Sequence, residues 1–130
     1  MPSNTAPATA APQTSCDRGP DTPPLVKLEV STGQAITFDF FYCFTPGHMI
    51  VRLDDKILVD RPVPPPATVH VDVAPLPPGL HSLSWLFHPV NLTWKAVSEI
   101  SVAGTVKRRQ TDDNSSPLHL VLDSVFLEVK

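Results

Sequence analysis

Prolines divide this chain into short segments, and their positions limit what it can fold into. Six of the sixteen prolines fall within the first 24 residues, and most of the others stand at the ends of apolar segments, as in 62–66 and 75–78. Because proline fixes φ and cannot donate a backbone hydrogen bond, it is disfavoured inside a helix or a central strand. This spacing predicts a small all-β domain behind a disordered tail.

Apolar and polar residues alternate through most of the chain from residue 25 onward. The segments that show this alternation are 26–30, 36–40, 49–53, 69–73, 83–87, 118–122 and 125–129, and 57–59 is expected to pair with 51–53 in a hairpin. A period of two is typical of strands half-buried in an antiparallel sheet. Residues 93–106 could form a helix or a strand, and a strand is chosen because they are rich in valine and threonine and because Trp94, Ala96, Ile100 and Val102 keep one parity. Residues 107–117, rich in turn-forming types, are expected to form the longest internal loop.

About seven or eight strands, each ended by a turn signal, predict an antiparallel immunoglobulin-like β-sandwich over residues 24–130. The segment LPPGLHSLSW, residues 76–85, resembles the turn and strand that come before the last strand in many such sandwiches. This resemblance implies an architecture but no activity, because sandwiches host many unrelated functions. The residues expected to pack between the sheets are Phe38, Val71, Leu83 and Trp85.

The first 23 residues form the predicted tail. They contain no leucine, isoleucine, valine or aromatic residue, so burial cannot offset the entropy lost on ordering them. The same segment lacks the basic start and apolar stretch of a secretory signal, and the chain has no apolar run long enough for a membrane helix. We therefore expect a cytoplasmic protein that does not contact a membrane.

The two cysteines are Cys16, in the predicted tail, and Cys43, in a strand-like segment. A disulfide between them would join the tail to a strand end, but reduced thiols are the expectation for a cytoplasmic protein. Asn91-Leu92-Thr93 and Asn114-Ser115-Ser116 match the pattern for N-glycosylation. A chain that never enters the secretory route would not be modified there.

One segment, YCFTPGHM at residues 42–49, has the residue types of a metal loop. It resembles the copper loop of azurin-type cupredoxins, and the resemblance implies Cys43 as a thiolate ligand and His48 as an imidazole ligand. No histidine precedes Cys43, however, and Met49 follows His48 at once rather than a few residues later. We therefore expect Cys43 to be a buried thiol and the domain to hold no metal or other cofactor.

Composition and motifs exclude several classes of function. A formal net charge of −3 without a basic stripe argues against a nucleic-acid partner. The one basic cluster, residues 107–109, is expected to be a solvated loop, because Asp112 and Asp113 follow closely. The motifs of metalloproteases, phosphate-binding loops and serine hydrolases do not occur. We therefore predict that the protein is not an enzyme.

Binding remains as the expected function. We predict a protein-interaction module whose partner is another protein and whose contact surface is formed by Phe41, Tyr42, Pro64, Pro65 and Trp94. The alternative is a carbohydrate-binding module, which would need an exposed aromatic platform from Trp94, Phe41, Tyr42 or Phe126. Because residues 40–44 are apolar on both strand faces, we expect a loop, a partner or a second copy to cover Phe41.

Overall fold

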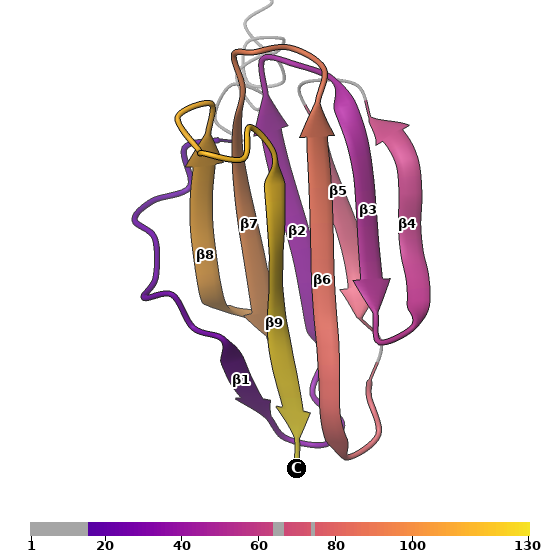
Figure 1. The fold of residues 1–130 in the computed structure, drawn as a ribbon. Coiled ribbons are helices and arrows are strands. Elements are labelled where there is room, and N and C mark those ends of the chain that lie inside the picture. The colour runs from indigo at the N-terminus through magenta and orange to yellow at the C-terminus, as the bar shows by residue number, and fades with distance from the viewer. Residues whose placement is uncertain (1–15, 64–66, 74) are drawn as a thin grey trace, which may run out of the picture.

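The computed structural model describes residues 16–63, 67–73 and 75–130, and within these ranges the chain forms nine strands in two sheets without a helix. The strands are β1 (Lys27–Val30), β2 (Ile36–Cys43), β3 (Gly47–Leu53), β4 (Lys56–Val63), β5 (Ala67–Val73), β6 (Gly79–Pro89), β7 (Lys95–Val102), β8 (Thr105–Asp113) and β9 (Val121–Val129). Sheet A has the order β1-β9-β6-β3-β4 and sheet B the order β5-β2-β7-β8 (Figure 1). The all-β prediction is confirmed, with nine strands instead of seven or eight. In this described part of the chain no helix is long and apolar enough to cross a membrane.

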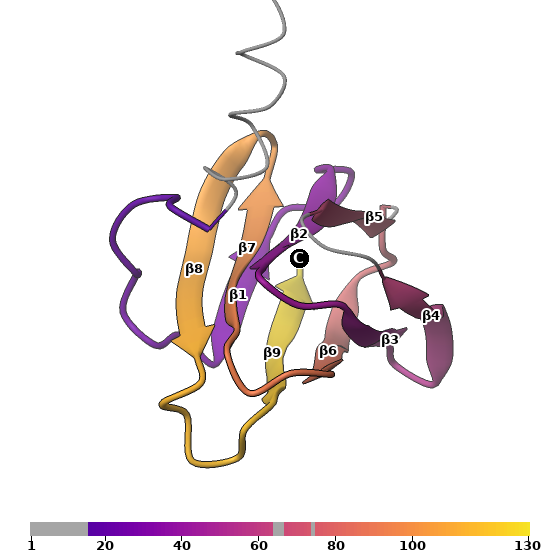
Figure 2. The same cartoon turned by 90° about the horizontal axis from the view of Figure 1, so that it is seen from above.

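The two sheets face each other across one apolar core, and Figure 2 shows them from above as two layers. The four residues predicted to lie in the core, Phe38, Val71, Leu83 and Trp85, are all buried, none more than 8% exposed. The ring centroids of Phe38 in β2 and Trp85 in β6 lie 4.9 Å apart. Since these rings come from different sheets, their contact joins the two layers.

The order of the connections differs from that of an immunoglobulin domain. Strands β6 and β9 are neighbours in sheet A, but the β7–β8 hairpin of sheet B separates them along the chain. In the immunoglobulin fold the corresponding neighbours are consecutive strands. One pairing is also parallel, because β1 runs beside β9 from Lys27↔Phe126 to Val30↔Val129. The prediction of a purely antiparallel arrangement is wrong at that edge.

The predicted loop over residues 107–117 is wrong for most of its length, because Thr105–Asp113 forms β8 and pairs with β7. Sequence periodicity did not indicate this strand, since its one buried side chain is Arg108, which is 5% exposed. The Arg108 guanidinium donates a 2.8 Å hydrogen bond to Asp123 of sheet A. The basic cluster at 107–109 is therefore not a solvated loop but part of a strand whose arginines are paired.

The last strand also begins later than predicted. Residues 118–120 form a turn, and β9 starts at Val121 with its buried residues at odd positions. Leu118 and Leu122, which were expected to face inward, are 62% and 61% exposed. His119 has a φ of 57°, a left-handed conformation that ends the alternation between these leucines.

The N-terminal segment 16–24 runs beside β8 before it enters β1 (Figure 1). Cys16 forms a disulfide with Cys43, so the expectation of two reduced thiols is wrong. Further along, the Thr22 amide donates to the Arg109 carbonyl at 3.0 Å, and the Arg109 amide donates to Thr22 Oγ1 at 2.9 Å. Of the predicted tail, residues 1–15 lie outside the described ranges, whereas residues 16–23 are docked by polar bonds and a disulfide rather than by apolar burial.

Candidate functional site

The outer face of sheet A carries a line of apolar side chains. The core residues of β3 and β6 have odd numbers, so their even-numbered residues point away from the core. The strand pairings Ile50↔Leu86 and Leu86↔Leu122 align three of these outward residues across β3, β6 and β9. Leu122 is 61% exposed, while Ile50 and Leu86 are half-buried. We call these three residues the apolar row.

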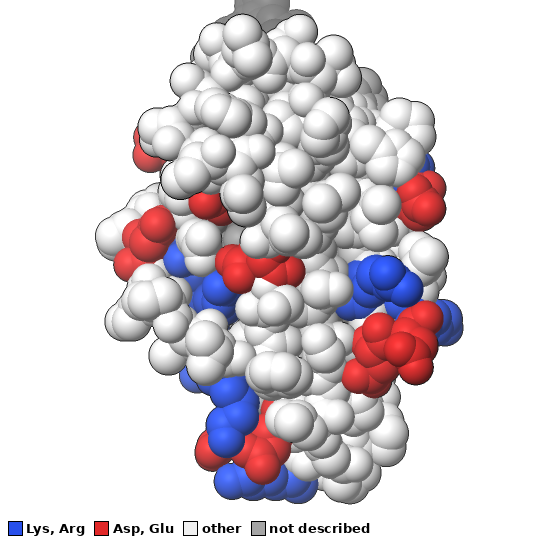
Figure 3. Space-filling view, viewed as in Figure 1, with Lys and Arg blue, Asp and Glu red and all other residues white. Residues whose placement is uncertain are grey.

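Both charged and uncharged residues border the apolar row, and Asp60 of β4 pairs directly with Ile50. His48 and His88 are paired on the side towards the loops, and Ser84 and Ser124 are paired on the other side. The three residues of the row themselves line a shallow depression, together with Arg52, Ser84 and Trp85. In Figure 3 the charged residues lie at the middle, the lower part and the margins of this face, whereas its upper part is free of Lys, Arg, Asp and Glu.

Above the apolar row, three loops meet at one end of the molecule: residues 44–46, 90–94 and 114–120 (Figure 1). We call this region the loop end. The Val90 amide donates to the Pro46 carbonyl at 2.9 Å, and the Asn114 amide donates to the Trp94 carbonyl at 3.2 Å. These bonds hold the loops together. The large apolar side chains exposed there are Phe44 (68%), Val90 (69%), Leu92 (87%) and Leu118 (62%).

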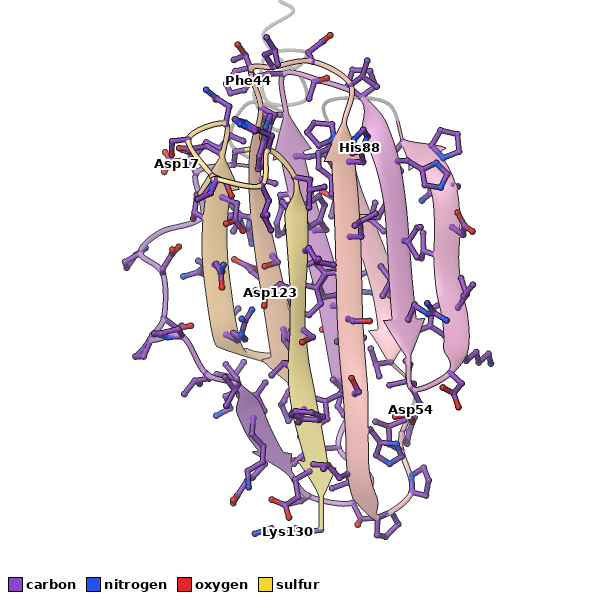
Figure 4. All side chains as sticks on the ribbon, viewed as in Figure 1. Asp17, Phe44, Asp54, His88, Asp123 and Lys130 are labelled. Atoms are coloured by element: carbon purple, nitrogen blue, oxygen red, sulfur yellow. A yellow bond between two sulfur atoms is a disulfide. The ribbon has the colours of Figure 1, made fainter. Side chains whose placement is uncertain are left out.

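Phe44, labelled at the top of Figure 4, has a φ of 76°. A bulky residue other than glycine rarely adopts this left-handed conformation, which costs on the order of 1–3 kcal/mol. Thr45, the next residue, is fully buried, and its side-chain oxygen accepts a hydrogen bond from the Asn91 amide at 3.1 Å. The turn therefore anchors Thr45 inside the loop end while it directs the neighbouring phenylalanine into solvent.

Two of the five residues predicted to form the contact surface are buried, and a third is partly covered. Tyr42 is 1% exposed and Trp94 is 2% exposed, so both belong to the core. The guanidinium carbon of Arg18 lies 4.2 Å from the centroid of the Phe41 ring, so the N-terminal segment covers Phe41. Pro64 and Pro65 lie outside the described residues. Among the aromatics considered for a carbohydrate platform, Phe126 is the exposed one, at 48%.

The copper-loop resemblance does not lead to a metal site. The sulfur of Cys43 is bonded to Cys16 and is therefore not available as a thiolate ligand. His48 lies in the other sheet, where its Nε2 atom is 2.6 Å from Asp60 Oδ1. Within the described ranges no three His, Cys, Asp or Glu residues are grouped so as to hold a metal ion.

Two further histidines make bonds to carboxylates. On the outer face of sheet B, His70 contacts Asp39 at 2.6 Å and Asp72 at 3.1 Å, and the bond to Asp39 is the main reason why the pKa of His70 lies above its ordinary value of 6.5. In sheet A, His81 contacts Asp54 at 2.8 Å, which raises the pKa of His81 and lowers that of Asp54. The hydrogen bonds of both histidines go to carboxylates or to a backbone carbonyl.

The apolar row was not among the residues predicted to bind a partner. A signal was present in the sequence for two of its members. Ile50 and Leu86 are apolar residues at the parity that should be polar, each flanked by two core residues. Leu122 carried no usable signal, because it was assigned to the inward parity of a strand that begins later.

The chain matches no protein-family model, no curated protein and no solved structure. Its function must therefore be argued from the surface itself.

Proposed function

We propose that this domain is a non-enzymatic protein-interaction module that binds its partner through the outer face of sheet A, centred on the apolar row. The observation that carries the proposal is the alignment of Ile50, Leu86 and Leu122 on three adjacent strands, with Leu122 61% exposed. Contiguous exposed apolar side chains bordered by polar residues are typical of contact surfaces between proteins.

The architecture we infer is a β-sandwich of immunoglobulin-like layout with a changed order of connections. Two facing sheets of five and four strands support this inference. In such a layout the outer face of a five-stranded sheet offers a broad surface, and a typical stable interface needs about 800 Å² from each partner. The burial of Tyr42 and Trp94 favours a protein partner over a carbohydrate, because it removes two of the aromatics that a sugar platform would use.

We place the protein in an oxidising compartment rather than in the cytoplasm. The Cys16–Cys43 disulfide supports this placement, because such bonds form and persist in extracellular and lumenal environments and are rare in the cytosol.

Site-specific photo-crosslinking tests the contact surface. A photoreactive residue at Leu122 should give a discrete adduct with a partner protein, and the substitution Ile50→Asp should abolish that adduct. The matched control is the same probe at Leu80, which is 60% exposed, against 61% for Leu122. Leu80 lies on the same outer face but far from the apolar row, six positions before Leu86 at the other end of β6. Adducts of equal yield from both positions, or adducts that survive Ile50→Asp, would show that the apolar row is not the contact.

A further inference from the structure

We propose that Asn91 carries an N-linked glycan. This inference concerns a site at the loop end and goes beyond the proposed interaction face. It depends on four features of the structure: the disulfide, the exposure of the acceptor sequence, the difference between Asn91 and Asn114, and the apolar side chains around Asn91.

The disulfide is evidence against the expectation for which glycosylation was set aside. The acceptor sequence Asn91-Leu92-Thr93 was set aside because residues 1–23 lack the basic start and apolar stretch of a secretory signal, so the chain was expected to stay in the cytoplasm with reduced thiols. Cys16 and Cys43 are instead bonded. Disulfides form in the lumen of the secretory route, which is also where asparagine side chains receive glycans.

The acceptor sequence is accessible in the folded domain. Asn91, Leu92 and Thr93 are all exposed and follow the end of β6 directly. The backbone amide of Asn91 is held by Thr45 Oγ1, but within the described ranges the side-chain amide of Asn91 makes no hydrogen bond. A glycan on this amide would extend into solvent without breaking a bond of the fold.

The second acceptor sequence is less open. The side-chain oxygen of Asn114 accepts a hydrogen bond from the Trp94 amide at 3.5 Å, and the Asn114 amide donates to the Trp94 carbonyl. Ser116, which would present the required hydroxyl, is half-buried and is followed by Pro117. We therefore assign the modification to Asn91 and use Asn114 as the internal control.

A glycan at Asn91 would also account for the apolar side chains around it. Val90 and Leu92 flank Asn91 and are 69% and 87% exposed. Phe44, 68% exposed, precedes the threonine that holds the Asn91 amide. Exposed apolar groups of this size promote association between copies, and a bulky, solubilising glycan in their midst shields them.

The modification is a group transfer whose second substrate is an oligosaccharide carried on a lipid diphosphate. The Nδ2 atom of Asn91 forms a bond to the anomeric carbon of the first sugar, and the bond between that carbon and the phosphate oxygen breaks. The lipid diphosphate leaves with the bonding electron pair, and a base of the oligosaccharyltransferase takes one amide proton. The Thr93 hydroxyl is the group that the transferase recognises two positions after the asparagine.

The test uses the full chain fused behind a cleavable secretory signal, because residues 1–23 lack the basic start and apolar stretch of one. The protein is secreted from a eukaryotic cell line and treated with peptide N-glycosidase. We expect the enzyme to increase the electrophoretic mobility by the equivalent of one glycan and to convert Asn91 to aspartate, which peptide mass spectrometry detects. Asn91→Gln and Thr93→Ala should each abolish the shift, whereas Asn114→Gln should retain it.

Two results would overturn the inference: a parent chain whose mobility the enzyme does not change, or a shift that persists in both Asn91→Gln and Thr93→Ala. A denaturant titration of Asn91→Gln guards against a folding defect. Thr93→Ala provides a second variant that leaves the asparagine in place.

Discussion

The outer faces of the two sheets both carry apolar residues but differ in what covers them. On sheet B, Phe41 and Val97 are paired on the outer face, and Val97 is only 1% exposed. The N-terminal segment 16–24 supplies the cover, through the disulfide of Cys16 and the stacking of Arg18 on Phe41. On sheet A, the apolar row has no such cover within the part of the chain that the structure describes.

This difference suggests how the domain divides its surface. A sheet with apolar side chains on its outer face needs another layer to remove them from water. The chain provides that layer for sheet B from its own N-terminal segment. For sheet A, the proposal assigns the same role to a separate protein.

The largest effect is expected when the cover of sheet B is released. The double variant Cys16→Ser/Cys43→Ser loses a crosslink between residues 27 positions apart, so chain entropy predicts a loss of about 3–4 kcal/mol in the free energy of unfolding. Urea titration measures it, and reduction of the parent protein should give the same midpoint. A loss below about 0.5 kcal/mol, the size of an ordinary surface substitution, would mean that the disulfide does not hold the cover.

A smaller effect is expected from Glu99, which lies under the same cover and is 3% exposed. Its carboxylate accepts hydrogen bonds from Arg109 Nε at 2.7 Å and from Arg18 Nε at 3.2 Å. Glu99→Gln should lower the free energy of unfolding by about 1–3 kcal/mol, because it weakens two charge-assisted bonds at a buried position.

The matched control for this variant is Glu29→Gln. Glu29 contacts Lys130 with both side chains more than 60% exposed, so removing its charge should cost less than about 0.5 kcal/mol. If Glu99→Gln and Glu29→Gln lower the free energy of unfolding by the same amount, the N-terminal segment does not bury Glu99 in solution.

The smallest expected effect is a pH-dependent change in stability at His70, on the part of the outer face of sheet B that segment 16–24 leaves exposed. The hydrogen bond to Asp39 raises the pKa of His70 above 6.5 in the folded state, so this bond stabilises the fold fully below pH 6.5. Its contribution is lost as the pH rises through the raised pKa. His70→Gln should therefore be less stable than the parent at about pH 5.5 and should approach it at about pH 9.

Thermal unfolding at several pH values measures this difference, and Asp39→Asn should show the same pH dependence. A deficit of His70→Gln that grows towards high pH would contradict the assignment of the bond.

Whether a strand could be predicted from the sequence depends on whether the residues that stabilise it are near to it or distant from it along the chain. Strands β2, β3, β5 and β6 were located because their core residues alternate, a local property that any window of the chain reveals. Strand β8 was missed because its buried residue is an arginine, and the charge of Arg108 is compensated by Asp123, which belongs to another strand and is distant in the sequence. Segment 16–24 was missed for the same reason, because its docking depends on Glu99, Arg109 and Cys43.

The candidate surface was only partly predictable from sequence. The prediction of a binding surface near Tyr42 and Trp94 chose aromatics by type, but residue type does not distinguish a core ring from an exposed one. Ile50 and Leu86 could have been selected by their parity. Leu122 required the true start of β9, which the left-handed turn at His119 sets.

The pairing of β1 with β9 has a consequence for the chain during its synthesis. Lys27 pairs with Phe126 and Val30 with Val129, about one hundred positions apart. Strand β6, which contains Trp85, has β9 as one of its two neighbours. A ribosome that has not yet released residues 121–129 therefore carries a chain in which the edge of β6 is open. Unpaired strand edges of this kind invite other strands to add to them. This edge of β6 is therefore closed only after β9 has left the ribosome and paired with it.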